Sequence, residues 1–297
     1  MHQRTLKKEC HFEGKGLHTG TVSNMTVKPA PAGHGVKFLR TDLGVTIEAL
    51  AENVSDTSRS TTISYGGASV HTIEHIMSAL TGMGIDNALI EIDNIEVPIL
   101  DGSARFYVEA FAAVGAEEQD AEREYIGIED IIVLENPKSG SKIVIEPASE
   151  PSLDVTIDFN SEVLGVQKAH WDESIDYASQ IAPCRTFVFF HELEALFTHN
   201  LIKGGDVDNA IVIVEHPVED ERVEKLAALF GKEKLRVEEG YLSNLQLHFP
   251  DECGRHKLLD LLGDLRLCGG FLKAHVTAYK PGHTINTKAA KAFRSQL

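Results

Sequence analysis

The sequence predicts an α+β fold made of two similar domains, each a small β-sheet packed on helices. The chain has 297 residues, which is long enough for two domains of ordinary size. Each half begins with short strands and continues with helical patterns, an order typical of α+β domains. Residues 117–124, between the halves, form an acidic run without apolar periodicity. We therefore predict an N-terminal domain over residues 1–120 and a C-terminal domain over residues 121–297.

The composition excludes several classes of protein. With 42% hydrophobic and 25% charged residues, the chain has the make-up of a globular protein. No apolar run reaches the roughly 18–20 residues of a transmembrane helix, and the basic N-terminus lacks the apolar region of a secretory signal. The formal charge of -17 opposes nucleic-acid binding, because a polyanion would be repelled. The four cysteines include no C-x-x-C pair, so we expect neither disulfides nor a thiolate zinc site. A reducing cytoplasm is the compartment that fits this pattern best.

In order along the first half, the patterns predict strands, a helix, a further strand and a second helix. The strand regions are separated by turns rich in Pro, Ala and Gly. The first helix carries an apolar stripe at i, i+3, i+4 and i+7, formed by Ile73, Ile76, Met77 and Leu80. The predicted elements are strands over 21–27, 36–54 and 90–93, a helix over 71–80, and a helix capped by Ser103 that runs to Gly115.

Glu74 and His75 are neighbours at the start of the first helix. Together with His71 they match H-x-x-E-H, the inverted zinc-peptidase pattern. Five-residue matches also arise by chance, and two solvent-facing polar residues at a helix start would give the same pattern. The glycine-rich loop over 14–20 lacks the order of a nucleotide-triphosphate loop, which favours a plain turn over a loop that approaches a ligand.

The second half also opens with strands, of which residues 153–160 alternate without a fault. The stretch over about 187–214 is rich in Phe and Leu, which is typical of core but equally of an apolar ligand channel. Residues 215–247 suggest no mechanism, and extra surface structure is the default interpretation. The predicted elements are strands over 131–134, 143–145, 153–160, 184–190, 210–214 and 274–279, a helical stretch with Leu193, Leu196 and Phe197, and helices near 221–230, over 255–264 and over 288–293.

The helix over 255–264 has the strongest functional pattern. His256, Asp260 and Asp264 follow one another at four-residue steps and therefore share one face. Most other positions are leucine, and buried charge without a partner is costly. A divalent metal is one such partner, since His and Asp at i, i+4 can reach the same ion. An ordinary helix whose polar face meets solvent or an arginine is the alternative.

Six short motifs are spread over nearly the whole chain. They are Gly16-Leu17-His18-Thr19-Gly20, Thr72-Ile73-Glu74-His75, Ile99-Leu100-Asp101-Gly102-Ser103, Arg185-Thr186-Phe187, Arg255-His256-Lys257-x-x-Asp260 and Gly282-His283. In this order they resemble the motifs of the UDP-3-O-acyl-N-acetylglucosamine deacetylases, the zinc amidases that commit Gram-negative bacteria to lipid A synthesis. Each motif alone would be weak, and the order of all six makes the resemblance specific.

The resemblance implies zinc-dependent hydrolysis of the substrate's acetamide, with an active site between the two domains. The implied Zn2+ ligands are His75, His256 and Asp260, with a water in the fourth position. Three protein ligands and an open position are typical of catalytic zinc. The implied catalytic residues are Glu74 as general base, Thr186 as oxyanion donor, and His283, supported by Asp264, as general acid or positive charge.

The resemblance also implies how a UDP-linked acylated N-acetylglucosamine would bind. Lys257, beside a ligand, would contact the substrate, and the segment over about 187–214 resembles the family's passage for the acyl chain. Lysines would supply the local cations that a diphosphate requires in so acidic a chain. The other positions that resemble substrate contacts are Lys280, Lys142, Phe159, Asn160, Leu17, His18 and Phe187.

Two other interpretations compete with this one. An inverted zinc peptidase would use His71 and His75 as ligands, but it leaves His256 and Asp260 unexplained. A non-catalytic acyl or nucleotide-sugar binding protein would not need Glu74 beside a ligand. The resemblance also implies a monomer, and some members of the family are fused to a hydroxyacyl-carrier-protein dehydratase.

Overall fold

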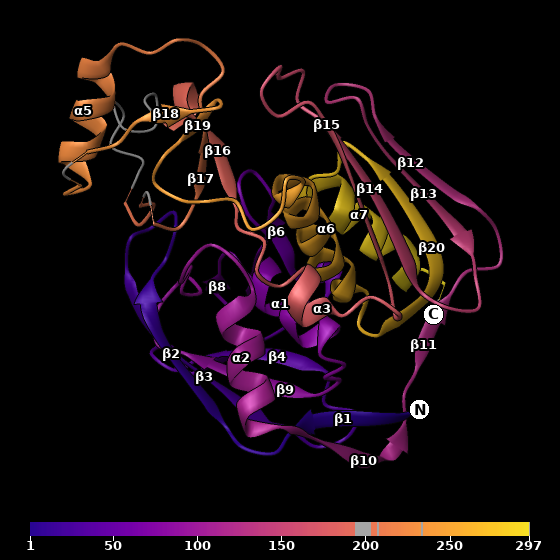
Figure 1. Cartoon of the computed structure of the whole chain (residues 1–297). Coiled ribbons are helices and arrows are strands. Elements are labelled where there is room, and N and C mark those ends of the chain that lie inside the picture. The colour runs from indigo at the N-terminus through magenta and orange to yellow at the C-terminus, as the bar shows by residue number, and fades with distance from the viewer. Residues whose placement is uncertain (194–202, 207, 233, 297) are drawn as a thin grey trace.

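The computed structural model describes residues 1–193, 203–206, 208–232 and 234–296. It has the mixed α+β architecture that the sequence predicts, with several β-sheets packed on helices (Figure 1). Within these residues, no helix is both long enough and apolar enough to cross a bilayer. The predicted Leu196 and Phe197 of the second half lie outside the described residues.

The first half forms a mixed sheet with the strand order β2-β3-β9-β4-β5. Alternation buries one face of these strands, as Val27, Phe38 and Ile90 illustrate. The strands are β2 (Cys10–Lys15), β3 (Val22–Pro29), β4 (Val36–Arg40), β5 (Val45–Glu48) and β9 (Ala88–Ile92). Around them lie β6 (Val54–Asp56), β7 (Thr62–Tyr65), β8 (Ala68–Val70), the 3-10 turn η1 (Ala51–Asn53) and helices α1 (Glu74–Gly82) and α2 (Arg105–Val114).

Two local predictions in this half differ from the structure. Most of the acidic run over 117–124, for which the sequence predicts no strand, forms β10 (Ala116–Glu122), which pairs with β1 (His2–Leu6). The N-cap of α2 is Ala104 rather than Ser103. The Ser103 hydroxyl still accepts a hydrogen bond from the backbone N–H of Arg105, at 3.1 Å. The predicted capping residue therefore bonds the first turn of α2 from the position before the N-cap.

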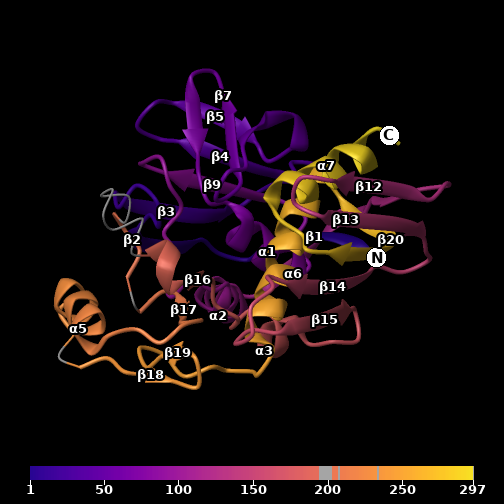
Figure 2. The same cartoon turned by 90° about the horizontal axis from the view of Figure 1, so that it is seen from above.

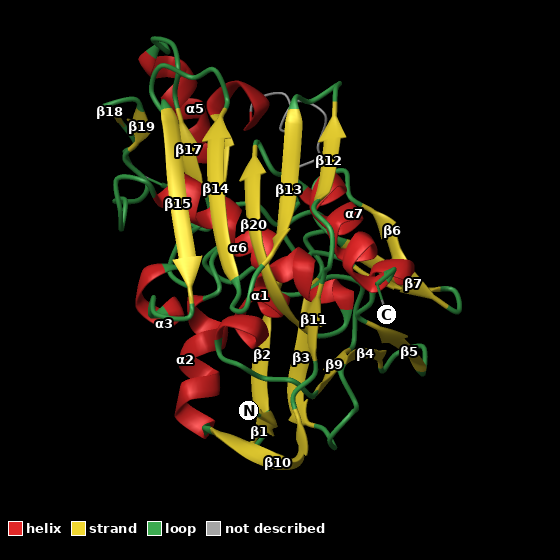
Figure 3. Ribbon diagram, turned by 90° about the vertical axis from the view of Figure 1, so that its right-hand side faces the viewer, coloured by secondary structure: helices red, strands yellow, loops and turns green. Residues whose placement is uncertain are grey.

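The second half forms a sheet with the order β12-β13-β20-β14-β15, and β11 pairs with the start of β20 (Figure 3). The strands are β11 (Tyr125–Gly127), β12 (Ile132–Asn136), β13 (Ser141–Pro147), β14 (Ser152–Asp158), β15 (Val166–Asp172) and β20 (Phe271–Tyr279). The helical elements are α3 (Tyr177–Gln180), α6 (Glu252–Leu265), η2 (Arg266–Cys268) and α7 (His283–Arg294). β12, β13, β14, β20 and α6 agree with the predicted elements within a few residues. β11, β15 and α3 were not predicted, and α7 begins five residues before the predicted helix over 288–293.

The two large sheets have the same topology. In each, two hairpins precede a helix, the central strand and a second helix. The central strand, β9 or β20, is antiparallel to one neighbour and parallel to the other. The helices α1 and α6, which precede these strands, pack against each other between the sheets (Figure 2).

A third, smaller sheet is separate from the two large sheets (Figure 1). Its strand order is β16-β17-β19-β18. The strands are β16 (Phe187–Phe189), β17 (Ile211–Ile213), β18 (Val237–Glu238) and β19 (Tyr241–Leu242). With α5 (Asp220–Leu229), it encloses a separate apolar cluster that includes Phe190, Val212 and Leu226. Residues 215–247 therefore share a small apolar core with residues of the predicted acyl-chain insert.

Candidate metal and catalytic site

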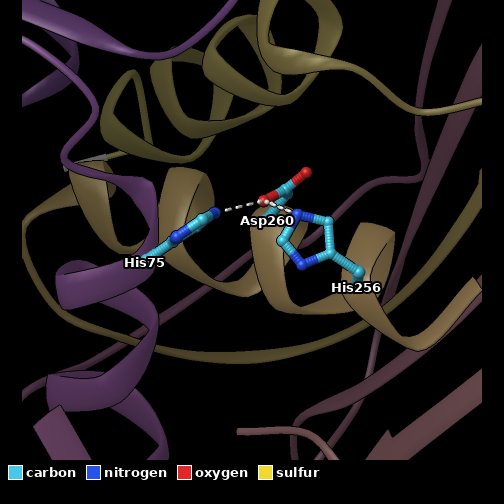
Figure 4. Close-up of side chains that lie close together, drawn as sticks. All are labelled: His75, His256 and Asp260. Carbon is cyan, nitrogen blue, oxygen red and sulfur yellow. Dashed lines mark ion pairs between the residues drawn. The ribbon is translucent and has the colours of Figure 1, made fainter. Parts of the chain in front are cut away.

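Three buried side chains meet where α1 and α6 pack together. His75 lies on α1, and His256 and Asp260 lie one turn apart on α6 (Figure 4). Their candidate ligand atoms all fall within 4.8 Å of one another. Asp260 Oδ1 is 3.6 Å from His75 Nε2 and 3.4 Å from His256 Nε2. The structure thus gathers the three residues that the sequence predicts as metal ligands.

The hydrogen bonds around this cluster fit a metal. Asp260 Oδ1 is buried without a hydrogen-bond partner, whereas Oδ2 accepts a bond from Lys257 Nζ at 2.8 Å. His256 Nδ1 donates to the Cys184 carbonyl oxygen at 3.0 Å, which leaves the Nε2 lone pair for a ligand bond. Burial lowers the pKa of His256 to about 4, so the ring is neutral as ligation requires. These N, N and O donors suit a divalent metal, and a cation would compensate the unpaired carboxylate oxygen.

Gly263 lets the two ligand-bearing helices approach. A Cβ at this position would overlap the backbone carbonyl oxygen of Glu74, which cannot move without shifting α1. We expect Gly263→Ala to lower stability by about 1–3 kcal/mol and to weaken metal binding, because His75 and Asp260 would separate. Thermal unfolding and a metal titration check this. Gly127→Ala, where the new Cβ would make only ordinary contacts, should change neither.

Glu74 is buried in the first turn of α1, next to the ligand His75. Its Oε2 accepts a hydrogen bond from the backbone N–H of Thr61 at 3.0 Å. Its Oε1 lies 3.8 Å from His283 Nε2. Burial raises the pKa of the Glu74 carboxyl, which makes it a better proton acceptor once ionised. The solvent-facing alternative for this residue is therefore wrong.

His283 and Asp264 form a pair beside Glu74. His283 Nδ1 and Asn286 Nδ2 both donate to Asp264 Oδ2 at 2.9 Å. Burial of the ring opposes its protonation, but the charges of Asp264 and Glu74 outweigh this effect and raise the pKa of His283 to about 9. The ring is therefore a cation at neutral pH, with Nε2 directed to the side where Glu74 lies.

A cavity of about 620 Å³ adjoins this pair. Its walls include five of the predicted site residues, Lys257, Lys280, Phe159, Asn160 and His283. Lys280 Nζ also pairs with Asp158 Oδ2 at 3.2 Å. Lys142 is absent from the described walls, and its Nζ pairs with Glu135 at 2.9 Å. The cavity therefore gathers four of the eight predicted substrate contacts and leaves Lys142 aside.

Thr186 and Phe187 enter from the third sheet. The backbone N–H of Thr186 donates to the Gly102 carbonyl oxygen at 2.8 Å, and its own carbonyl accepts from Ile211 at 2.8 Å. The Phe187 ring lies 6.4 Å from the His256 ring and 5.6 Å from Lys257 Nζ. Phe187 thus borders the metal cluster, while the role of the Thr186 hydroxyl stays a prediction.

The loop with Leu17 and His18 is held in place by Glu96, which is fully buried. Glu96 accepts bonds from the backbone N–H groups of His18 and Thr19, at 3.0 and 2.7 Å, and from the Thr72 hydroxyl at 2.7 Å. His18 Nε2 is buried without a hydrogen-bond partner, and burial lowers the pKa of this ring. The loop is therefore fixed by buried hydrogen bonds, while contact of Leu17 and His18 with a substrate stays a prediction.

His71 completes the H-x-x-E-H pattern but stands outside the metal cluster. Its backbone N–H donates to the Ile95 carbonyl oxygen at 2.9 Å. In the part of the chain that the structure describes, the residues that could hold a metal are His75, His256 and Asp260. The ligand set of an inverted peptidase is not the one gathered here.

Four residues of the site were not predicted: Thr61, Glu96, Arg59 and Asn286. Thr61, Glu96 and Asn286 are nearly or fully buried and bond the predicted residues, and Arg59 lines the cavity. Asn286 lies three residues after His283 on α7, which helical spacing could have revealed. The other three have no local pattern that distinguishes them.

Comparison with known proteins gives one consistent family. A family model described as "LpxC: UDP-3-O-acyl N-acetylglycosamine deacetylase" matches residues 3–228 and 232–295. A "Bifunctional enzyme LpxC/FabZ" of Bacteroides thetaiotaomicron is 43% identical over 300 residues, covering 100% of this chain and 65% of that protein. The protein of the same name from Porphyromonas gingivalis is 45% identical over 298 residues, covering 99% of this chain and 64% of that protein.

A shorter relative is a "UDP-3-O-acyl-N-acetylglucosamine deacetylase" of Myxococcus xanthus, 40% identical over 297 residues. The alignment covers 99% of this chain and 86% of that protein. This chain therefore spans less than two thirds of the bifunctional relatives but most of the single-function one. The family match includes every residue of the metal cluster and of the His283 pair. The chain belongs to the UDP-3-O-acyl N-acetylglycosamine deacetylase family.

Proposed function

We propose that this protein is a zinc-dependent deacetylase of lipid A synthesis. Its reaction would hydrolyse the acetamide of UDP-3-O-(3-hydroxyacyl)-N-acetylglucosamine to the free amine and acetate. The observation that carries the proposal is the buried cluster of His75, His256 and Asp260, with Glu74 beside it, in a chain of this family. Zinc, when bound, supplies Lewis-acid chemistry that polarises a carbonyl and acidifies water.

Two residues support the three ligands in this proposal. Lys257 occupies Asp260 Oδ2, so that Oδ1 is the oxygen presented to the two imidazole rings. The Cys184 carbonyl oxygen fixes the tautomer of His256. Such partners of the ligands orient them and raise their affinity for the metal.

Glu74 would act as the general base. Its Oε1 would accept a proton from the attacking water, while the Thr61 amide keeps Oε2 in place. His283, held as a cation by Asp264, would then donate a proton from Nε2 to the departing amine nitrogen. The Thr186 hydroxyl would donate to the oxygen on which negative charge develops.

Replacing Asp264 by Asn tests the proposed acid. The Asp264 charge is the main cause that raises the pKa of His283 to about 9, so its loss lowers that pKa. The wild-type His283 ring stays protonated until the pH approaches this raised pKa. In Asp264→Asn the pKa is lower, so the ring would lose its proton at a lower pH than in the wild type. We expect the alkaline limb of the kcat profile to move to lower pH, with bound zinc unchanged. A profile that keeps its alkaline limb would remove His283 as the acid.

The cavity of about 620 Å³ would take the UDP end of the substrate. Lys257 and Lys280 supply positive charge for a diphosphate, and Phe159 and Asn160 lie where a nucleotide could pack. Lys142 would join them only by leaving Glu135. Leu17, His18 and Phe187 would contact the sugar and the start of the acyl chain. The proposed acyl passage over about 187–214 includes residues outside those that the structure describes.

We further propose how the protein is organised. Two similar domains, 1–120 and 121–297, with the site between them, are supported by the shared topology of the two sheets and by ligands from both α1 and α6. The four cysteines are unpaired, which supports a reducing cytoplasm as the compartment. We propose a monomer, and a dehydratase partner in a longer chain is suggested by the names of the bifunctional relatives.

Release of acetate from the UDP-linked substrate by the purified zinc-loaded chain tests the function. We expect stoichiometric acetate and free amine. A chain that binds the substrate without releasing acetate would be a binding protein, and the proposal would fail.

A further inference from the structure

Thr61 lies directly before β7 and is fully buried against the start of α1. Its backbone N–H donates to Glu74 Oε2 at 3.0 Å. Its carbonyl oxygen accepts the N–H of Ile73, the N-cap of α1, at 3.3 Å. Two backbone bonds therefore fix this residue to the helix turn that carries Glu74.

The Thr61 side chain reaches the opposite side of the site. Its hydroxyl donates to Asp264 Oδ1 at 2.5 Å, while Oδ2 accepts from His283 and Asn286. The Asp264 carboxylate is buried, and these donors hold both of its oxygens. Hydrogen bonds to an ionised carboxylate are strong, so the donor at Oδ1 restrains the rotation of the group that orients the His283 ring.

We infer that Thr61 is a positioning residue that sets the spacing between Glu74 and His283. The inference rests on the proposed function, which gives these two groups their roles as base and acid. Glu74 Oε1 and His283 Nε2 stand 3.8 Å apart, and Thr61 bonds to Glu74 on one side and to Asp264 on the other. Because proton transfer depends on such distances, loss of the hydroxyl acts on kcat rather than on KM.

Thr61→Val removes the hydroxyl, nearly preserves the shape, and leaves the amide bond to Glu74. We expect kcat to fall about tenfold, with KM and bound zinc unchanged. Thr61→Ser keeps a hydroxyl and should restore kcat. Thr62→Val, which changes the neighbouring buried threonine, should match the wild type. Wild-type kcat in Thr61→Val, or a Thr61→Ser enzyme as slow as Thr61→Val, would overturn the inference.

An NMR measurement on the zinc-loaded full chain separates this inference from the proposed function. The Nδ1 proton of His283, bonded to Asp264, should be protected from exchange in the wild type and in Thr61→Ser, and lost in Thr61→Val. His283→Gln identifies the resonance. If the wild type releases no acetate, the proposed function fails while the resonance still tests Thr61. An unchanged resonance in Thr61→Val would contradict the positioning role.

Discussion

Replacing His256 by Ala is expected to abolish zinc binding and deacetylation together. The substitution removes one of three ligands that converge at the cluster and leaves Asp260 Oδ1 with a single imidazole opposite it. Zinc contributes several kcal/mol of transition-state stabilisation, so activity should fall at least about a thousandfold. Metal content of the purified variant and its rate of acetate release measure the two losses.

His71→Ala is the matched control for this variant. It removes the first histidine of the H-x-x-E-H motif, which stands outside the cluster. We expect it to keep zinc and most of the activity. If His71→Ala lost the metal while His256→Ala retained it, the ligand assignment would be overturned and an inverted-peptidase site would be favoured.

The second large effect is expected from Glu74→Gln. Glutamine has nearly the same shape and can still accept the Thr61 amide bond through its carbonyl oxygen, but it cannot take a proton at neutral pH. Loss of a general base lowers kcat by about 10²- to 10⁴-fold. Zinc content should be unchanged, because Glu74 is not one of the three clustered ligands.

Glu91→Gln is the control for this substitution, since Glu91 pairs with Lys28 on β3, away from the cluster. It should deacetylate at the wild-type rate. Unimpaired kcat in Glu74→Gln would eliminate this residue as the base, while a loss of zinc in that variant would reassign it to metal binding.

Much of the fold follows from local patterns in the sequence. The strict alternation of residues 153–160 and the four-residue spacing of His256, Asp260 and Asp264 each reflect one element, β14 or α6, and both predictions are confirmed. The meeting of His75 with that helix depends instead on the packing of α1 against α6. That packing requires a residue without a side chain at position 263, because a Cβ there would overlap α1. The hydrophobic periodicity of the sequence does not reveal this requirement.

The residues that escaped prediction act through long-range contacts. Thr61 bonds Glu74 and Asp264 from a position just before a strand, where a threonine is unremarkable by composition. Glu96 is a buried carboxylate that is satisfied entirely by loop donors, and a sequence pattern cannot distinguish it from an exposed one. The charge of residues 117–124 hides a strand, because a two-stranded ribbon leaves most of the side chains of β10 in water.

The most direct test of the account is a titration of zinc into the metal-free protein while acetate release from UDP-3-O-(3-hydroxyacyl)-N-acetylglucosamine is measured. We predict no release before zinc is added, and a rate that rises until one equivalent is bound at His75, His256 and Asp260. Full activity of the metal-free protein, or no acetate at any zinc concentration, would contradict the account.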